Sequence, residues 1–93
     1  MPRLSIIVTA YNIEPYIRES LDCVLAQTLR DIEIIVVDDG STDGTFEAAN
    51  AETANMGGIE LRVFRTEDNL GAGQARNRAI EEATGTYLAF LDA

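Results

Sequence analysis

The chain of 93 residues carries 16 acidic side chains against seven basic ones, giving a formal net charge of −9, and it contains no histidine. Because all seven basic residues are arginines, imidazole-dependent catalysis, lysine Schiff bases and phosphate loops that need a lysine are excluded. The acidic balance disfavours binding to nucleic acid and suits a site for a divalent cation. With 46% hydrophobic residues, the composition is that of one small globular unit.

Four short apolar runs of strand length are spaced along the chain, and they occupy residues 4–9, 32–38, 59–65 and 86–92. The second run is apolar on four consecutive positions, from Ile34 to Val37, so both of its faces are expected to be buried. Strands of this kind are typical of a parallel sheet covered by helices on two sides.

Three helix-length segments separate these runs. In the first, Pro15 suits the first helical turn. An apolar stripe at helical spacing follows, made by Ile17, Leu21, Val24, Leu25 and Thr28. This stripe predicts a helix that packs on the sheet.

The second segment extends from Asp43 to about Asn55, and Ser41 or Thr42 is expected to cap it. The third segment carries a stripe of small side chains with one larger one, made by Ala75, Ala79, Ile80 and Ala83. Such a stripe lets a helix lie close to a sheet, and Gly85 is expected to be the left-handed residue just past its end.

Cys23 is the single cysteine, so no internal disulfide can form, and a half-buried thiol is expected there. The first apolar run is too short for a signal peptide or for a membrane span. We therefore expect a cytoplasmic location, although the sequence does not decide whether a longer parent protein is membrane-associated.

The alternation of strands and helices predicts an α/β fold in three layers, αβα, with a four-stranded parallel, Rossmann-like sheet. If the strand order is 3-2-1-4, the winding reverses between the first and the fourth strand, and ligands bind at such a switch point. The carboxyl ends of these strands are followed or closed by Thr9 to Asn12, residues 38–41 and Asp92. These three segments are expected to line one crevice.

Tyr11 could stack on a planar ligand such as a nucleobase, a contact worth about 1–3 kcal/mol. The alternative is a tyrosine that closes the core with its hydroxyl in water. Asp38 and Asp39 are adjacent, so their side chains are expected to point to opposite faces of the strand. Asp39 is expected to accept a hydrogen bond from a ligand, the alternative being simple turn chemistry with Gly40.

Two arginines and a further carboxylate complete the candidates. Arg76 could offset the carboxylates or touch a base or phosphate, whereas Arg78 is expected to be a surface cation that balances Glu81 or Glu82. Asp92 ends the fourth run, where its carboxylate is expected to bind a ribose hydroxyl or a divalent metal.

Five motifs occur in order along the chain, namely LSIIVTAYN at 4–12, SL to QT across 20–28, IVVDDGSTD at 35–43, NxG with ARN across 69–77, and GTYLAFLD at 85–92. Together they resemble the nucleotide-binding half of a family 2 glycosyltransferase, which is an inverting enzyme with the GT-A fold. The resemblance covers the whole chain. It implies that residues 1–93 are the N-terminal nucleotide-sugar-binding part of a glycosyltransferase domain, a partial GT-A fold.

The resemblance implies a role for each matching position. Thr9 and Tyr11 would cradle and stack the base of a nucleotide-sugar donor, most often uridine diphosphate, with Asn12 among the nucleotide-binding residues. Asp39 would bind the base imide, with Asp38 nearby.

Arg76 would lie beside the base. Asp92 matches the first carboxylate of the D-x-D motif, which contacts the ribose and, with the second carboxylate, a divalent metal such as Mn²⁺ or Mg²⁺. The sequence ends at Ala93, before the second Asp, and without the family's acceptor-binding half or general base.

From this departure we expect a chain truncated after Ala93 that has no catalytic residue and no activity by itself, although its parent is a glycosyltransferase. The alternative is a non-catalytic nucleotide-binding or interaction module. The sugar and the acceptor are not indicated. Because the fourth strand is apolar and lacks a neighbour on its far side, self-association through that edge is also expected.

Overall fold

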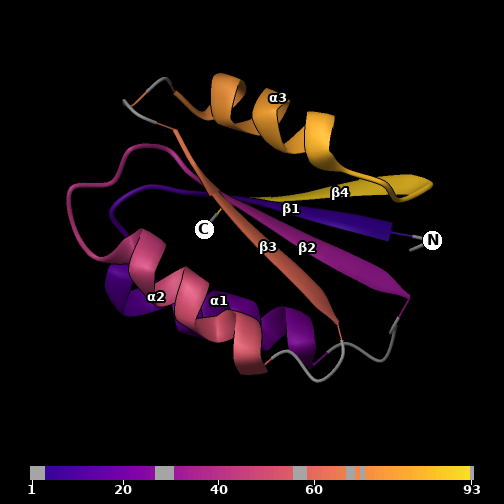
Figure 1. Cartoon of the computed structure of the whole chain (residues 1–93), viewed down its shortest axis with the longest axis horizontal. Helices are drawn as coiled ribbons and strands as arrows, with labels where there is room; N and C mark the ends of the chain where they lie inside the picture. Colours follow the sequence, from indigo (N-terminus) through magenta and orange to yellow (C-terminus); the bar gives the residue numbers. More distant parts are fainter. Residues whose placement is uncertain (1–3, 27–30, 56–58, 67–68, 70, 93) are drawn as a thin grey trace.

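Four parallel strands form the centre of the molecule. The computed structural model describes residues 4–26, 31–55, 59–66, 69 and 71–92. In the order in which they lie side by side, the strands are β3 (Glu60–Arg65), β2 (Ile32–Asp38), β1 (Leu4–Ala10) and β4 (Tyr87–Asp92) (Figure 1). The predicted strand order and parallel direction are confirmed.

Helices cover both faces of this sheet. Helices α1 (Glu14–Leu25) and α2 (Thr45–Ala51) lie on one face, and α3 (Ala72–Glu82) lies on the other (Figure 1). A short 3-10 helix, η1 (Glu52–Asn55), continues α2. The three-layer architecture predicted from the alternation of strands and helices is therefore confirmed.

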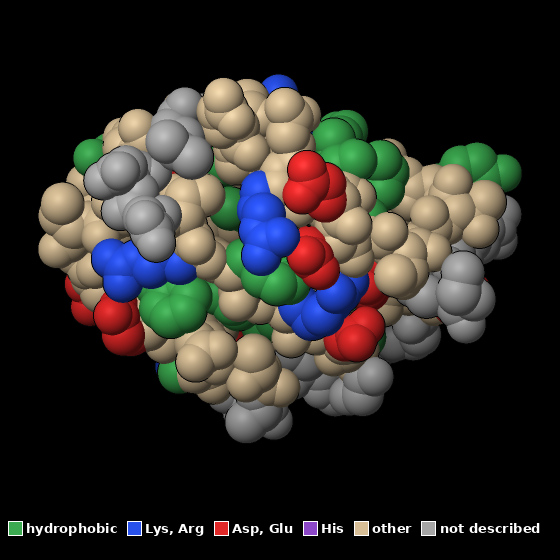
Figure 2. All heavy atoms as spheres, turned by 45° about the horizontal axis from the view of Figure 1, so that its top comes forward, with side chains coloured by type: hydrophobic (Ala, Val, Ile, Leu, Met, Phe, Trp, Pro, Cys, Tyr) green, Lys and Arg blue, Asp and Glu red, His purple; other side chains and the backbone are tan. Residues whose placement is uncertain are grey.

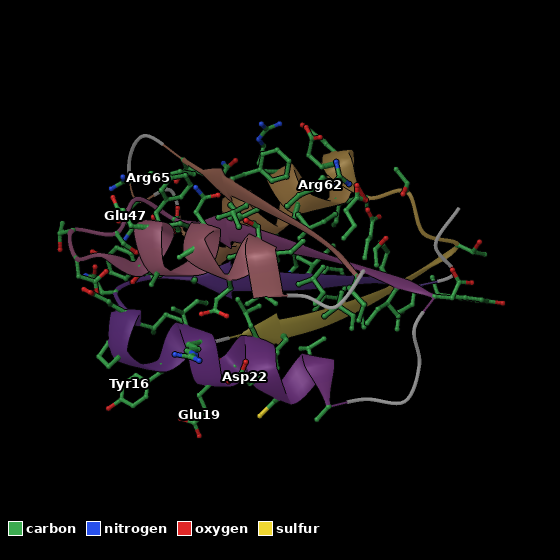
Figure 3. The ribbon with its side chains drawn as sticks, turned by 60° about the horizontal axis from the view of Figure 1, so that its bottom comes forward. Tyr16, Glu19, Asp22, Glu47, Arg62 and Arg65 are labelled. Carbon is green, nitrogen blue, oxygen red and sulfur yellow. The ribbon has the colours of Figure 1, made fainter. Side chains whose placement is uncertain are left out.

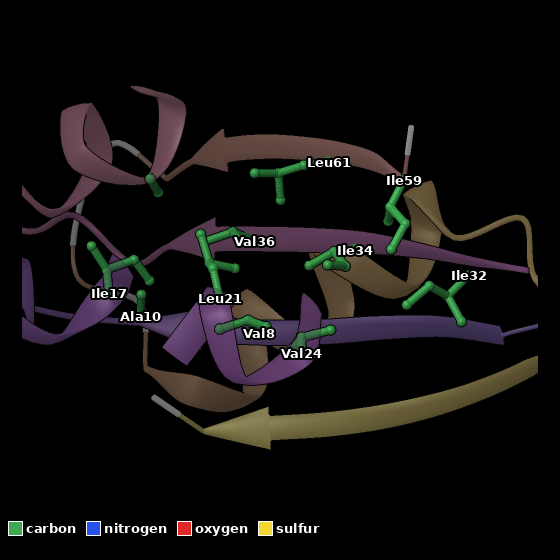
Figure 4. Close-up of a cluster of buried hydrophobic side chains, with 11 residues drawn as sticks. Val8, Ala10, Ile17, Leu21, Val24, Ile32, Ile34, Val36, Ile59 and Leu61 are labelled. Atoms are coloured by element: carbon green, nitrogen blue, oxygen red, sulfur yellow. The ribbon is translucent and has the colours of Figure 1, made fainter. Parts of the chain in front are cut away.

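Alternate residues of β2 serve two separate cores. Ile34 and Val36 face α1, whose predicted stripe contributes the buried side chains Ile17, Leu21 and Val24 (Figure 4). On the other face, β1 and β2 pack against two alanines of α3, in a cluster of Ile7, Ile35, Val37, Ala75 and Ala79. Successive side chains of β2 point to opposite faces of the sheet, and the small side chains of α3 let that helix pack closely on the second face. Both faces of β2 are therefore buried.

The start of α2 differs from the prediction. Neither Ser41 nor Thr42 caps this helix, since its N-cap position is Gly44. Asp43 instead accepts the N–H of Thr45 through Oδ1, at 2.9 Å. The hydroxyl groups expected at the cap are used by the neighbouring loop, which the sequence pattern alone does not reveal.

Gly85 also has a different role from the predicted one. Its φ is not among the positive values, and Ala83 after α3 is extended. A Cβ on Gly85 would lie 2.5 Å from the Ser5 Oγ and 2.7 Å from the Ser5 backbone nitrogen. Glycine is needed here because the connection from α3 to β4 passes directly against β1.

Three smaller expectations have mixed outcomes. Cys23 is exposed and not half-buried, and Ile80 is 39% exposed, so it does not belong to the packed stripe of α3. Thr28 lies outside the described residues.

Within the described part of the chain, no helix has the length and apolar character that crossing a bilayer requires.

Candidate functional site

The carboxyl ends of β1, β2 and β4 lie at one edge of the sheet. In the pairing of β4 with β1, Asp92 is opposite Thr9, and in the pairing of β2 with β1, Asp38 is opposite Ala10. Thr9 is buried at this edge. The fold thus brings the three predicted segments together at the switch point between β1 and β4.

The two adjacent aspartates serve different loops. Asp38 is completely buried. Its Oδ1 accepts hydrogen bonds from the backbone N–H of Ser41, at 3.3 Å, and from the Ser41 hydroxyl. Its Oδ2 lies 3.5 Å from Nε of Arg65. In this structure Asp38 therefore contacts protein groups of the β2–α2 loop and of β3, and it has no surface open to a ligand.

Asp39 holds the connection between β3 and α3. Its Oδ2 accepts the backbone N–H of Gly71 at 2.9 Å, and its Oδ1 accepts the hydroxyl of Thr66 at 3.1 Å. Gly71 has a φ of 94°, a conformation that favours glycine. The predicted contact of Asp39 with a base stays a prediction.

Asn12 joins the β1–α1 loop to the β2–α2 loop. Its backbone N–H donates to the Ser41 Oγ at 2.9 Å, and its side-chain Oδ1 accepts the backbone N–H of Thr42 at 2.9 Å. Its φ of 51° lies in the left-handed region, which asparagine tolerates better than most residues. The adjacent Tyr11 is 43% exposed, so the joined loops present an aromatic ring to solvent.

The same two loops are joined again where their helices begin. Ile13 donates its N–H to the Thr45 Oγ1 at 2.9 Å, and Glu14 donates its N–H to Asp43 Oδ2 at 3.2 Å. In return, Gly44 donates its N–H to Glu14 Oε1 at 2.8 Å. The hydrogen bond from the Thr45 hydroxyl is the main reason why the pKa of Asp43 lies below its ordinary value. At the start of each helix, a backbone N–H is thus accepted by a side chain of the other segment.

Arg76 and Arg78 have separate surroundings, as their spacing predicts. The Arg76 guanidinium lies over the ring of Phe90 in β4, 5.5 Å from its centre, which connects α3 to the strand that carries Asp92. Arg78 makes an ion pair with Glu82 at 2.8 Å, so its predicted role as a surface cation is confirmed. On the side of the molecule that carries α3, arginine side chains lie among acidic and apolar ones (Figure 2).

Arg65 ends β3 and lies beside the joined loops. It belongs to none of the sequence motifs, so it was not selected from the sequence. Its Nη2 donates to the backbone carbonyl of Ser41 at 2.7 Å, in addition to its contact with Asp38. Its Nη1 is 3.9 Å from Glu47 of α2, and the two side chains lie next to each other in Figure 3. The register of β2 and β3, which pairs Asp38 with Arg65, is the signal that could have found it.

A second polar cluster surrounds Glu33, which is 1% exposed near the amino end of β2. Its carboxylate accepts hydrogen bonds from the Ser5 hydroxyl at 2.6 Å, the Thr84 N–H at 2.7 Å and Arg62 at 2.9 Å. Burial raises the pKa of Glu33, but these hydrogen bonds outweigh it and lower the pKa to about 2. The cluster lies at the opposite end of the strands from the crevice, so it is not part of the candidate site.

A metal site is not formed by the described residues. Among them there is no group of three or more cysteine, aspartate or glutamate side chains placed to hold an ion. The backbone of Asp92, the predicted metal ligand, pairs with that of Thr9 in β1. Its role as a metal ligand stays a prediction.

A parallel α/β sheet whose winding reverses between β1 and β4 belongs to the doubly wound, Rossmann-like class of folds, which bind ligands at such a switch point. A sequence model of glycosyl transferase family 2 matches residues 5–93, and the chain belongs to this family. Among its relatives, an uncharacterized glycosyltransferase of Bacillus subtilis, EpsJ, is 46% identical over 92 residues. That match covers 99% of this chain and 26% of the relative.

Solved structures agree with the family assignment and with the GT-A fold. A mannosyltransferase of Pyrobaculum calidifontis, in complex with GDP-Man and Mn²⁺, has a TM-score of 0.89 and 33% identity, covering 98% of this chain and 27% of that protein. S. aureus TarS 1–349, in complex with UDP-GlcNAc, has a TM-score of 0.86 and 36% identity, covering 97% and 26%. The chain thus spans about a quarter of the length of these proteins.

Proposed function

We propose that the chain forms the donor-nucleotide site of an inverting glycosyltransferase that transfers a sugar from a nucleoside-diphosphate donor, a UDP-sugar in the first instance. The observation that carries the proposal is the exposed side chain of Tyr11 at the carboxyl end of β1, on a loop fixed by Asn12. The residue before it, Ala10, accepts the backbone N–H of Asp39 at 2.9 Å. Membership of family 2 and the similarity to proteins solved with GDP-Man and UDP-GlcNAc support it.

Each residue of the proposed site has a physical task. The Tyr11 ring stacks on the base, because every base has a π-face. The Asp39 carboxylate accepts the base imide, and Arg76 lies beside the base. Thr9 cradles the base together with Tyr11, and Asp92, which is opposite Thr9 in the pairing of β1 and β4, contacts the ribose. Asn12 keeps the loop that carries Tyr11 in place.

Titration with nucleotides tests the proposal. We expect saturable binding of UDP to the chain by isothermal titration calorimetry, measured with and without Mn²⁺ or Mg²⁺ and compared with GDP. Tyr11→Ala is expected to weaken binding by about 5- to 150-fold, which corresponds to the loss of one stacking contact of about 1–3 kcal/mol.

Tyr16→Ala provides a matched control. Tyr16 is 63% exposed and lies on the outer side of α1, where Figure 3 shows it near Glu19. Its removal is expected to leave nucleotide binding unchanged. If the wild-type chain binds neither nucleotide, or if both tyrosine variants bind alike, the nucleotide proposal is wrong and the interaction module is favoured.

Two further predictions are tested separately. Turnover of a donor with Mn²⁺ or Mg²⁺ tests whether the chain is inactive by itself. Self-association through the edge of β4, where Tyr87, Leu88, Phe90 and Leu91 are exposed, is tested by light scattering across concentration. A monomer at all concentrations would count against it.

A further inference from the structure

Arg65 connects three elements that surround the base-binding loops. It ends β3, and its guanidinium donates to the carbonyl of Ser41 in the β2–α2 loop. The same group lies 3.5 Å from the Asp38 carboxylate and 3.9 Å from that of Glu47 in α2. Its guanidinium carbon is also 5.6 Å from the centre of the Phe46 ring. A planar guanidinium makes these contacts in several directions at once, which an ammonium does not.

Asp38 depends on a nearby cation because it is completely buried. A buried carboxylate is costly unless it is paired and hydrogen-bonded. Its Oδ1 accepts two hydrogen bonds from Ser41, while its Oδ2 is the oxygen that lies toward Arg65. The arginine therefore offsets the charge that fixes the position of Ser41.

Ser41, held by Asp38, in turn fixes the loop that carries Tyr11. Its hydroxyl proton is donated to Asp38, which leaves the oxygen as the acceptor for the N–H of Asn12 at 2.9 Å. This hydrogen bond helps to hold Asn12 at its positive φ, immediately after Tyr11. The contacts form one series from Arg65 through Asp38 and Ser41 to Asn12.

We infer that Arg65 and Asp38 are positioning residues that hold the nucleotide-binding loops in their binding conformation. This inference rests on the proposed function, and it gives Asp38 a role behind the site in place of direct contact with the nucleotide. If the loops are in the binding conformation for only a fraction of the time, the observed affinity for the nucleotide is the intrinsic affinity multiplied by that fraction.

Arg65→Met and Arg65→Lys test the inference, and Arg78→Met is the matched control. Arg78 resembles Arg65 in three ways, since its side chain is 44% exposed against 42%, it pairs with a carboxylate, and it lies over a phenylalanine ring. It differs in having no contact with the β2–α2 loop among the contacts described. The measurements are the affinity for UDP and the amide hydrogen exchange of Asn12 and Ser41, which requires no nucleotide.

We expect Arg65→Met to weaken UDP binding by about tenfold and to speed exchange at both amides, whereas Arg78→Met stays within about twofold of the wild type on both measures. Arg65→Lys keeps the charge and is expected to recover part of the affinity. If Arg65→Met does not fold, Arg65→Lys takes its place, with a smaller loss expected.

Equal affinity and equal exchange in the Arg65 variants and the Arg78 control would overturn the inference. A wild-type chain that binds no nucleotide would overturn the proposed function instead. In that case the exchange rates still decide whether Arg65 orders the loops, because they are measured on the chain by itself.

Discussion

Replacing Glu33 by glutamine should remove a large part of the stability of this chain. The buried carboxylate accepts hydrogen bonds from strand β1, from the connection after α3 and from Arg62 of β3. A glutamine of the same shape can keep its oxygen toward Ser5 and Thr84. Its amide would then face the Arg62 guanidinium, donor against donor, and the charge that this arginine offsets would be lost.

The magnitude follows from the pKa of the group. A carboxyl pKa lowered from 4.5 to about 2 by folding corresponds to about 3 kcal/mol of stability at pH 7. Because the folded-state pKa lies below the unfolded one, this contribution is complete above pH 4.5 and is lost as the pH falls toward 2. Small domains are stable by about 5–15 kcal/mol, so the loss is a substantial share.

Urea unfolding between pH 2.5 and pH 7 measures this effect. We expect Glu33→Gln to unfold with about 3 kcal/mol less free energy than the wild type at pH 7, and the two curves to converge as the pH falls. Glu60→Gln is the control, because Glu60 lies 4.0 Å from the same arginine but its side chain is 61% exposed. That variant should change the free energy of unfolding by less than about 1 kcal/mol.

Two results would refute the reasoning. The first is a Glu33→Gln variant as stable at pH 7 as Glu60→Gln. The second is a pair of curves, wild type and Glu33→Gln, that stay parallel down to pH 2.5. Either would mean that the hydrogen bonds around Glu33 do not favour its charged form. If Glu33→Gln does not fold, Ser5→Ala removes one donor to the carboxylate, together with the acceptor of the Gly85 N–H, and its pH dependence allows the same comparison.

Three further predictions concern packing and capping. Gly85→Ala is expected to destabilise the chain by about 1–3 kcal/mol in urea unfolding, because its methyl group would collide with the Ser5 backbone 2.7 Å away. Leu21→Ala, at a fully buried position of α1, is expected to cost about 2–5 kcal/mol in the same assay, and a loss below 1 kcal/mol would contradict the packing described. In an NMR titration, the pKa of Asp43 should lie below its ordinary value and should rise in Thr45→Val, and an unchanged pKa in that variant would exclude the hydroxyl as its cause.

The fold could be predicted from the sequence because its determinants are local. The continuous apolar run from Ile34 to Val37 required a strand buried on two faces, and the spacing of Ile17, Leu21 and Val24 required a helix beside it. These patterns recur at short distances along the chain, so they can be recognised without knowing any partner.

The polar contacts of the site could not be predicted in the same way, because they join residues that are distant in the sequence. Ser41 resembles a helix cap, but its hydroxyl bonds Asp38 and accepts from Asn12, which is 29 residues away. Gly85 resembles a helix end, but it is required by contact with Ser5, 80 residues away. Local propensity was overridden in both cases by tertiary contacts.

The separation of the two aspartates at the end of β2 also constrains the length of this strand. A deletion of one residue between Ile34 and Val37 would exchange the faces of everything that follows. Asp38, which fixes the β2–α2 loop, would then point to the face of the sheet that α3 covers. Asp39, which anchors the turn before α3, would point toward α2. We therefore expect β2 to accept exchanges among apolar side chains of similar size far more readily than a change in its number of residues.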